Sequence, residues 1–363
     1  MRADGVVSVD VIPVDVPLTD PFVIARGALA AAACAFVRVR LADGSAGYGE
    51  IAPFTALTGE TRDTSVTEAQ AMAHLLVGTA ASEWVETAAR LAERHPRQPA
   101  ARAGLECALV DACARSRNEP LYRMLGGADV RERVTDMTLP ILAESRIDEL
   151  AAGWYARGFR TFKLKVGIDP DAEARRVERL ATRFADITFI LDANQGFEPA
   201  AALSFTRSLV RWHPRIDMLE QPVARDDLDG MARLRSAGVP IAADESVFTL
   251  ADARRVIAAG AADIVNLKIT KTGFAETLEI ARAVRAAGLR LMIGGMMETR
   301  LAMAFSFAIA LGLGGIDFLD LDTPLLMADD PLEGGYRYDG PRLQPWSGAG
   351  VAMAPRPAAG FGM

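Results

Sequence analysis

Five charged residues recur at regular intervals between residues 165 and 268, each at or near the end of a short apolar run: Lys165, Asp192, Glu220, Asp244 and Lys268. The intervals of 27, 28, 24 and 24 residues each match about one strand, one helix and two short loops. Residues with this spacing in a closed parallel barrel converge at one rim. Three carboxylates and two amines at one rim predict a divalent metal ion flanked by two bases.

The three acids are candidate metal ligands. Asp192, Glu220 and Asp244 offer oxygen atoms with no cysteine or histidine near them in the sequence, which favours Mg²⁺, with Mn²⁺ as an alternative, and disfavours zinc. Each acid taken alone is better explained as a helix N-cap after a strand, but three of them on successive strands argue for a shared ligand. Asn194 and Glu245 are expected to orient the ligands or the lysines.

The lysines are candidate bases. Lys163 and Lys165 are two residues apart on a predicted strand, so their side chains share a face and point into the barrel mouth. A neighbouring ammonium and partial burial lower an amine's pKa, which predicts that Lys165 approaches the range of about 7 to 8 suited to a general base. Lys268 comes from the sixth predicted strand, across the barrel, so one lysine is expected to remove a proton from one face of a substrate and the other to return it on the opposite face. Lys271 is expected to pair with a surface acid.

The hydrophobic pattern predicts the elements that position these residues. Residues 1–125 are interpreted as an α+β domain, with antiparallel strands at 6–16 and 36–41 and helices at 66–76 and 100–116. From residue 126 to 322, short apolar runs alternate with Ala/Arg/Glu-rich helices, which predicts an α/β barrel. Its eight strands are expected at residues 134–139, 161–166, 187–193, 216–220, 241–244, 264–269, 291–294 and 318–322. The Gly- and Pro-rich segment 323–363 is expected to pack back on the first domain.

Composition limits the partners. The chain has 363 residues, 50% of them hydrophobic, which supplies a core for one barrel and a smaller domain. A net charge of −7 without a basic stripe argues against nucleic acid. Acidic residues near the N-terminus argue against a signal peptide, and the most apolar run, 301–313, is too short to cross a bilayer. Cys34, Cys107 and Cys113 lack metal or redox spacing, so a cytoplasmic protein with reduced thiols is expected, as a homo-oligomer by default.

Several phrases resemble a known family, the muconate-lactonizing-enzyme subgroup of the enolase superfamily. The matching phrases are Lys163-Leu164-Lys165, Leu191-Asp192-Ala193-Asn194, Glu220-Gln221-Pro222, Asp244-Glu245-Ser246, Asn266-Leu267-Lys268 and, in the first domain, Tyr48-Gly49-Glu50. The resemblance implies a (β/α)7β TIM-like barrel with an N-terminal α+β capping domain. It also implies removal of the proton α to a carboxylate, giving an enediolate held by Mg²⁺. The resemblance alone does not determine the product of the reaction.

Other stretches narrow the choice within the subgroup. Asp320 and Asp322 resemble the Asp-x-Asp pair with which dipeptide epimerases hold a free α-ammonium; the alternative is a cap or a pair with arginines. Residues 21–27 resemble the mobile capping-domain loop of L-Ala-D/L-Glu epimerases, where Arg26 would meet an acidic side chain, unless it is an ordinary surface arginine. Residues 55–60 would form the rest of the lid, with Glu60 available to a cation. Met296, Met297 and Glu298 are expected to line an adaptable pocket.

The sequence therefore predicts a Mg²⁺-dependent dipeptide epimerase, with L-Ala-D/L-Glu as one candidate substrate. Lys163 and the metal would bind the substrate carboxylate, while Lys165 and Lys268 would act on the α-carbon of the second residue. Rivals with the same site are o-succinylbenzoate synthase, N-acylamino acid racemase, muconate cycloisomerase and a proline-derivative dehydratase or epimerase. Relatives with a histidine base on the seventh strand are disfavoured, because the three histidines lie elsewhere. A non-catalytic barrel scaffold is a remote alternative.

Overall fold

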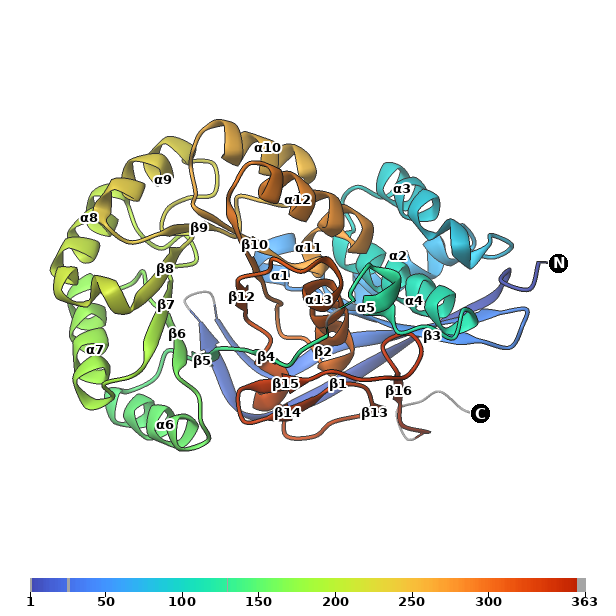
Figure 1. The fold of residues 1–363 in the computed structure, drawn as a ribbon, viewed down its shortest axis with the longest axis horizontal. Helices are drawn as coiled ribbons and strands as arrows, with labels where there is room; N and C mark the ends of the chain where they lie inside the picture. The colour runs from blue at the N-terminus through green and yellow to red at the C-terminus, as the bar shows by residue number, and fades with distance from the viewer. Residues whose placement is uncertain (1, 25–26, 129, 358–363) are drawn as a thin grey trace.

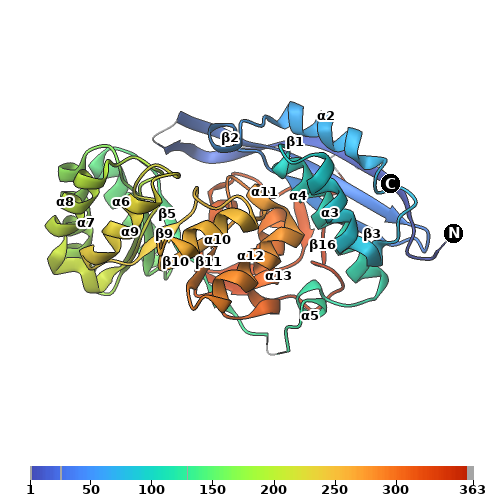
Figure 2. The same ribbon diagram turned by 90° about the horizontal axis from the view of Figure 1, so that it is seen from above.

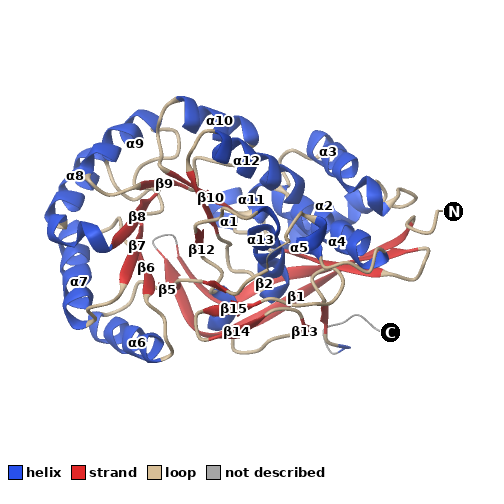
Figure 3. Cartoon of the chain, in the orientation of Figure 1, coloured by secondary structure: helices blue, strands red, loops and turns tan. Residues whose placement is uncertain are grey.

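An antiparallel sheet with helices precedes a curled parallel sheet that is wrapped by helices (Figures 1 and 3). The computed structural model describes residues 2–24, 27–128 and 130–357. The first part contains β1 (Val6–Ile24), β2 (Gly27–Leu41), β3 (Ala46–Ile51), α1 (Thr55–Thr58), α2 (Arg62–Ala73), η1 (Ala81–Glu83), α3 (Trp84–Arg94), α4 (Pro99–Ser116), α5 (Leu121–Met124) and β4 (Arg133–Val134).

The parallel sheet keeps its strands in chain order, from β5 to β12. Its elements are β5 (Met137–Leu139), α6 (Glu144–Ala156), β6 (Thr161–Lys165), α7 (Pro170–Arg183), β7 (Thr188–Asp192), α8 (Pro199–Ser208), η2 (Val210–Arg215), β8 (Ile216–Glu220), α9 (Leu228–Leu234), η3 (Arg235–Ala237), β9 (Ile241–Ala243), α10 (Leu250–Ala258), β10 (Ile264–Leu267), α11 (Ile269–Thr272), α12 (Phe274–Ala286), β11 (Arg290–Ile293), α13 (Arg300–Leu313) and β12 (Phe318–Leu319). The edge strands meet through hydrogen bonds from Asp136 N to Leu319 O (3.1 Å) and from Leu321 N to Thr135 Oγ1 (2.8 Å). The predicted TIM-like barrel with an N-terminal α+β part is confirmed.

Alternation along the barrel strands separates an apolar floor from a polar mouth. Side chains on five neighbouring strands form a buried apolar cluster: Ile190, Met218, Ala242, Ile264 and Met292. Side chains two residues apart on a strand share a face, so the next inward position stands one layer above this floor. On the first four of these strands that position is Asp192, Glu220, Asp244 and Asn266. The layer above the floor is therefore polar.

The long β1–β2 hairpin extends over one side of the barrel (Figure 2). Ala328 N donates to Pro17 O (2.8 Å), and Asp20 pairs with Arg146 on α6 (3.2 Å). Both strands are longer than the predicted 6–16 and 36–41. The alternation breaks at Pro17, where the pairing shifts register, and an edge strand tolerates proline without ending.

Strand β3 packs directly on helix α4. A Cβ atom at Gly47 would come within 2.1 Å of Ala112 N, so only glycine permits this approach. The predicted helix 100–116 is confirmed as α4, in which Cys107 and Cys113 are buried; these and Cys34 are free cysteines. The apolar run 301–313 lies in the buried helix α13, as predicted. In the described part of the chain, no helix is both long and apolar enough to cross a membrane.

The predicted strand 134–139 is divided in the structure. Its first part, β4, pairs with β15, and only its last part, β5, joins the barrel. The remaining elements follow the barrel: η4 (Thr323–Leu326), β13 (Leu332–Gly334), β14 (Arg337–Asp339), β15 (Arg342–Gln344) and β16 (Met353–Pro355). This last segment contacts the end of α4 and the start of α5, where Arg115 donates to Met353 O (2.6 Å) and Leu121 N donates to Gly350 O (2.9 Å).

Candidate active site

Charged side chains end the barrel strands side by side. Lys165 on β6 lies opposite Asp192 on β7, which lies opposite Glu220 on β8. Asp244 directly follows β9, and Lys268 directly follows β10. The parallel register thus brings the five residues of the sequence pattern to one rim of the barrel.

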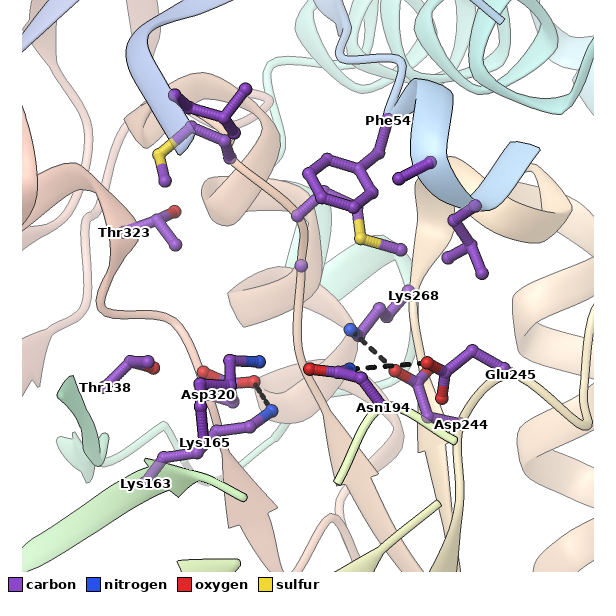
Figure 4. Close-up of a pocket in the computed structure, with 16 residues that line it drawn as sticks. Phe54, Thr138, Lys163, Lys165, Asn194, Asp244, Glu245, Lys268, Asp320 and Thr323 are labelled. Carbon is purple, nitrogen blue, oxygen red and sulfur yellow. Dashed lines mark hydrogen bonds and ion pairs between the residues drawn. The ribbon is translucent and has the colours of Figure 1, made fainter. Parts of the chain in front are cut away.

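A cavity at this rim lies between the cap and the barrel (Figure 4). The cap contributes an apolar wall made of Leu29, Phe54, Ala56 and Leu57. The barrel contributes Thr138, Lys163, Lys165, Asn194, Asp244, Glu245, Lys268, Gly295, Met296, Met297, Asp320 and Thr323. Both lysines of the two-base hypothesis therefore line the same space.

Lys163 stands among three carboxylates. Its Nζ lies 3.1 Å from Asp192 Oδ2 and 2.9 Å from Glu220 Oε2. It also donates to Asp320 Oδ2 at 2.8 Å. Burial alone would lower the pKa of Lys163, but these carboxylates raise it well above its ordinary value. Lys163 is a fixed positive charge in the cavity wall.

The two candidate bases each pair with one candidate metal ligand. Lys165 Nζ lies 2.7 Å from Asp192 Oδ2, and Lys268 Nζ lies 2.8 Å from Asp244 Oδ2. Burial would lower the pKa of Lys268, but Asp244 beside it raises the pKa above its ordinary value. A neighbouring ammonium and burial are the only influences that the sequence pattern indicates, whereas in the structure a carboxylate lies beside each amine.

Lys271 corrects a prediction. We expected it to pair with a surface acid, but it is buried, with 1% of its surface exposed. Its Nζ donates to Asp244 O (2.7 Å) and to Asp244 Oδ1 (2.5 Å). Burial lowers its pKa more than Asp244 raises it. The short helix α11 turns this side chain inward, so Asp244 is held from two sides by Lys268 and Lys271.

The three candidate ligands fit a hard cation by chemistry and burial. Asp192, Glu220 and Asp244 are at most 1% exposed. Burial would raise the pKa of Asp192, but Lys163 and Lys165 hold it well below its usual range. Their oxygens do not form a group within 4.8 Å of one another, but the Lys163 ammonium stands between Asp192 and Glu220 as a cation would. Anionic oxygens gathered around positive charge are the donors that Mg²⁺ prefers.

Neighbouring polar residues fix this rim. Asn194 Nδ2 donates to Glu245 Oε1 (3.3 Å), and burial and then Asp244 raise the pKa of Glu245 to about 7. Gln221, for which the sequence predicts no separate role, accepts at Oε1 from Asp244 N and from Ser246 N, both at 3.0 Å. Asn194 and Gln221 have φ values of 44° and 35°, a strained conformation that is typical of functional sites.

Asp320 and Asp322 follow β12 on the other side of the mouth. Asp320 lines the cavity, whereas Asp322 is fully buried behind it. Asp322 Oδ2 accepts from Thr138 N at 2.5 Å. Burial, followed by the charge of Asp320, raises the pKa of Asp322 to about 7. The pair shares a site with Thr138 of β5.

A third acid, which the sequence argument missed, completes this group. Asp136 is 3% exposed, and oxygens of Asp136, Asp320 and Asp322 all lie within 4.8 Å of one another. The signal in the sequence is an acid within the predicted strand 134–139, because a buried carboxylate is costly unless it is paired. The prediction of that strand assigned no role to Asp136.

The remaining candidates lie apart from the cavity or outside the described residues. Arg26 is not among the described residues. Glu298 is buried, accepts from Met296 N (3.0 Å) and does not line the cavity, and burial raises its pKa to about 8. Glu60 accepts from Ala100 N at 3.2 Å, at the start of α4. Glu60 therefore caps the start of α4 and is not among the residues that line the cavity.

The enolase-like class that this barrel and cap suggest is shown by comparison with known proteins. The model of the enolase C-terminal domain-like family matches residues 146–359, and the model of the mandelate racemase/muconate lactonizing enzyme N-terminal domain matches residues 6–126. The chain belongs to the mandelate racemase/muconate lactonizing enzyme family. The resemblance found in the sequence is confirmed.

Relatives with named activities cover most of the chain. An aromatic dipeptide epimerase of Herpetosiphon aurantiacus is 40% identical over 346 residues, which span 94% of this chain and 97% of the relative. An L-Ala-D/L-amino acid epimerase of Populus trichocarpa is 39% identical over 335 residues, which span 90% and 79%. The solved structure of a dipeptide epimerase from Enterococcus faecalis, complexed with Mg and the dipeptide L-Leu-L-Tyr, has a TM-score of 0.93 at 30% identity and covers 96% of this chain and 99% of that one.

Proposed function

We propose that this chain is a Mg²⁺-dependent dipeptide epimerase, an isomerase that inverts the α-carbon of the C-terminal residue of a dipeptide. The observation that carries the proposal is that Lys165 and Lys268 line one cavity from different strands, with Asp320 in the same wall. The printed activities of the relatives support the same reaction.

The two lysines would exchange one proton at the α-carbon. One uncharged amine takes the α-proton, and the electron pair of the broken C–H bond moves into the substrate carboxylate. The ammonium of the other lysine then gives a proton to the opposite face as the electron pair returns to carbon. Lys165 and Lys268 exchange these roles according to which epimer enters.

Charge in the cavity would stabilise the carboxylate while it carries the extra electron pair. Lys163, which lines the cavity, would bind one carboxylate oxygen. Asp192, Glu220 and Asp244 would hold the metal ion, with Mn²⁺ as an alternative to Mg²⁺. When bound, the ion supplies positive charge where negative charge develops.

The other wall would fix the free amine and the side chains. Asp320, backed by Asp322, would bind the α-ammonium of the dipeptide. The wall toward the cap is apolar, with Leu29, Phe54 and Met297 among its residues. This wall supports dipeptides with an apolar C-terminal residue over L-Ala-D/L-Glu, while an acidic side chain would need a cation such as Arg26.

The proposal also covers the domain boundaries, the cellular compartment and the oligomeric state. We propose residues 1–125 as a cap whose loops act as a lid, 126–322 as the catalytic barrel and 323–363 as the segment that ties them together. The three free cysteines support a reducing cytoplasm, and a homo-oligomer remains our expectation.

The test is proton exchange in D₂O. The Mg²⁺-loaded protein is incubated with L-Ala-L-Phe, L-Ala-L-Glu and their N-acetyl forms, and products are followed by NMR and mass spectrometry. We expect one deuterium at the α-carbon of the second residue and the L-Ala-D-residue product, faster for L-Ala-L-Phe. The matched control is Asp217→Asn, because Asp217 is on β8 but binds Thr188 away from the cavity. Faster turnover of N-acylamino acids than of every dipeptide would favour N-acylamino acid racemase instead.

A further inference from the structure

The acid cluster beside the cavity contains one carboxylate, that of Asp136, with no role in the proposed proton transfer. Asp136, Asp320 and Asp322 come together from β12 and from the residue just before β5. Asp320 lines the cavity, and the other two lie behind it. We call these three residues the acid triad.

The acid triad is poorly compensated. Among the residues that the structure describes, neither oxygen of Asp136 has a hydrogen-bond partner, and Asp322 Oδ1 also lacks one. Asp322 Oδ2 accepts from the backbone of Thr138, and Asp320 Oδ2 accepts from Lys163. An unpaired buried carboxylate is unfavourable unless a proton or a cation joins it.

The positive charge nearby does not balance the negative charge of the acid triad. Lys163 is the lysine beside the acid triad, and it is already shared with Asp192 and Glu220. Burial raises the pKa of Asp136 well above its ordinary value, and the negative charges of Asp320 and Asp322 add to the effect. The acid triad is therefore built to receive another positive charge.

We propose that Asp136 is a positioning residue that sets the preference of the cavity for a substrate with a free ammonium group. Asp136 adds a third carboxylate beside Asp320 and Asp322, and Lys163, which is shared with Asp192 and Glu220, does not balance all three. A dipeptide ammonium restores the charge balance, whereas a neutral N-acyl group does not. This inference rests on the proposed function and adds a residue that selects the substrate class.

Stability separates this role from a structural one. A structural carboxylate holds hydrogen bonds, so its removal lowers the melting temperature. Among the described residues the carboxylate of Asp136 accepts none, so the isosteric Asp136→Asn should raise the Tm of the substrate-free protein by about 2 °C or more, because it removes an unpaired buried charge. A lower Tm with unchanged substrate preference would overturn the proposal.

The direct test compares kcat/KM for L-Ala-L-Phe with kcat/KM for N-acetyl-L-Ala-L-Phe. In Asp136→Asn we expect this ratio to fall at least about tenfold, mainly through a higher KM for the free dipeptide, with kcat nearly unchanged. Asp136→Glu should recover part of the ratio. Glu106→Gln, which also neutralises a buried carboxylate but lies under α12, should leave the ratio unchanged.

Each alternative gives a different result. If the wild-type protein shows no preference for the free dipeptide, the proposed function fails; if it does and Asp136→Asn keeps the ratio, only the role of Asp136 fails. A second equivalent of bound Mg²⁺ that disappears in Asp136→Asn, measured by titration calorimetry, would make the acid triad a metal site and overturn the proposal. If Asp136→Asn does not fold, the ratio is measured in Asp136→Ala, where a fall supports the role of Asp136 and an unchanged ratio overturns it.

Discussion

The buried carboxylates on the two sides of the barrel mouth differ in the cations and hydrogen-bond donors that lie beside them. From β7 to β10, the carboxylates of Asp192, Glu220 and Asp244 each contact at least one lysine. Between β12 and β5, the acid triad has Thr138 N and a share of Lys163, and the carboxylate of Asp136 has no hydrogen-bond partner among the described residues. Each carboxylate on the first side thus has an ammonium beside it, whereas the second side has only a share of Lys163.

The largest effect on activity is expected from substitutions on the first side of the mouth, from β7 to β10. Asp192→Asn, Glu220→Gln and Asp244→Asn should each weaken Mg²⁺ binding and lower turnover by at least about 10³-fold, because several kcal/mol of charge stabilisation is lost. Calorimetry with Mg²⁺ and an epimerisation assay measure the two effects.

The control for this prediction is Asp217→Asn on the same strand as Glu220. Full activity of any of the three ligand variants, or of the wild-type protein in excess chelator, would refute the metal assignment. These variants also leave buried lysines with fewer partners, so some loss of stability is expected, by contrast with Asp136→Asn.

The next effect separates the two lysines. Lys165→Ala and Lys268→Ala should both block net epimerisation, since each lysine serves one face of the α-carbon. Each variant should still exchange the α-proton of one epimer with D₂O, and the two variants should prefer opposite epimers. Both variants epimerising at near wild-type rates would exclude the two-base mechanism.

A smaller effect on kcat/KM is expected from changes on the second side of the mouth, between β12 and β5. N-acetylation removes the cation from the substrate and Asp322→Asn removes an anion from the site, so each change should weaken kcat/KM by roughly 2 to 5 kcal/mol. The losses should not add, because the second change acts on an interaction that is already lost. A double-mutant-style cycle with free and acetylated L-Ala-L-Phe measures this, and simple additivity would return Asp322 to a structural role as the residue before η4.

The contrast also explains what the sequence predicted well. The interval between strands in a barrel is set by strand, helix and loop lengths, so Lys165, Asp192 and Glu220 were found from spacing alone. The floor beneath them follows from the same period of two, which places Ile190 below Asp192 and Met218 below Glu220.

The site features that the sequence did not predict lie in segments without a regular spacing of residues. Lys271 is on a single helical turn between β10 and α12, and only the packing of that turn directs its amine to Asp244. Asp136 lies in the short connection between β4 and β5, strands that join different sheets. The pairing of Lys163 with three acids depends on distances across the barrel, which a linear pattern does not contain.

The smallest expected effect is on the pH dependence of stability. It uses the buried carboxylate of Glu106 as a reference. Glu106 on α4 accepts from Ala275 N (3.1 Å) at the start of α12, so it has the structural partner that Asp136 lacks. Burial raises its pKa to about 7 from 4.5, and Arg102, at 4.0 Å, only partly opposes this. The folded state therefore binds this proton more tightly than the unfolded state, so the associated stability is fully present below pH 4.5 and is lost as the pH rises through about 7.

Between about pH 5.5 and pH 8, wild-type protein should lose about 2 kcal/mol of unfolding free energy that Glu106→Gln does not lose, as measured by urea unfolding at the two pH values. Other buried acids contribute equally to both proteins, so the difference isolates Glu106. Identical pH dependence in the two proteins would show that the partners of Glu106 already balance its charge. The same pair of measurements on Asp136→Asn should give a difference of the same sign, because burial raises the pKa of Asp136 and, among the described residues, no hydrogen bond to its carboxylate opposes this.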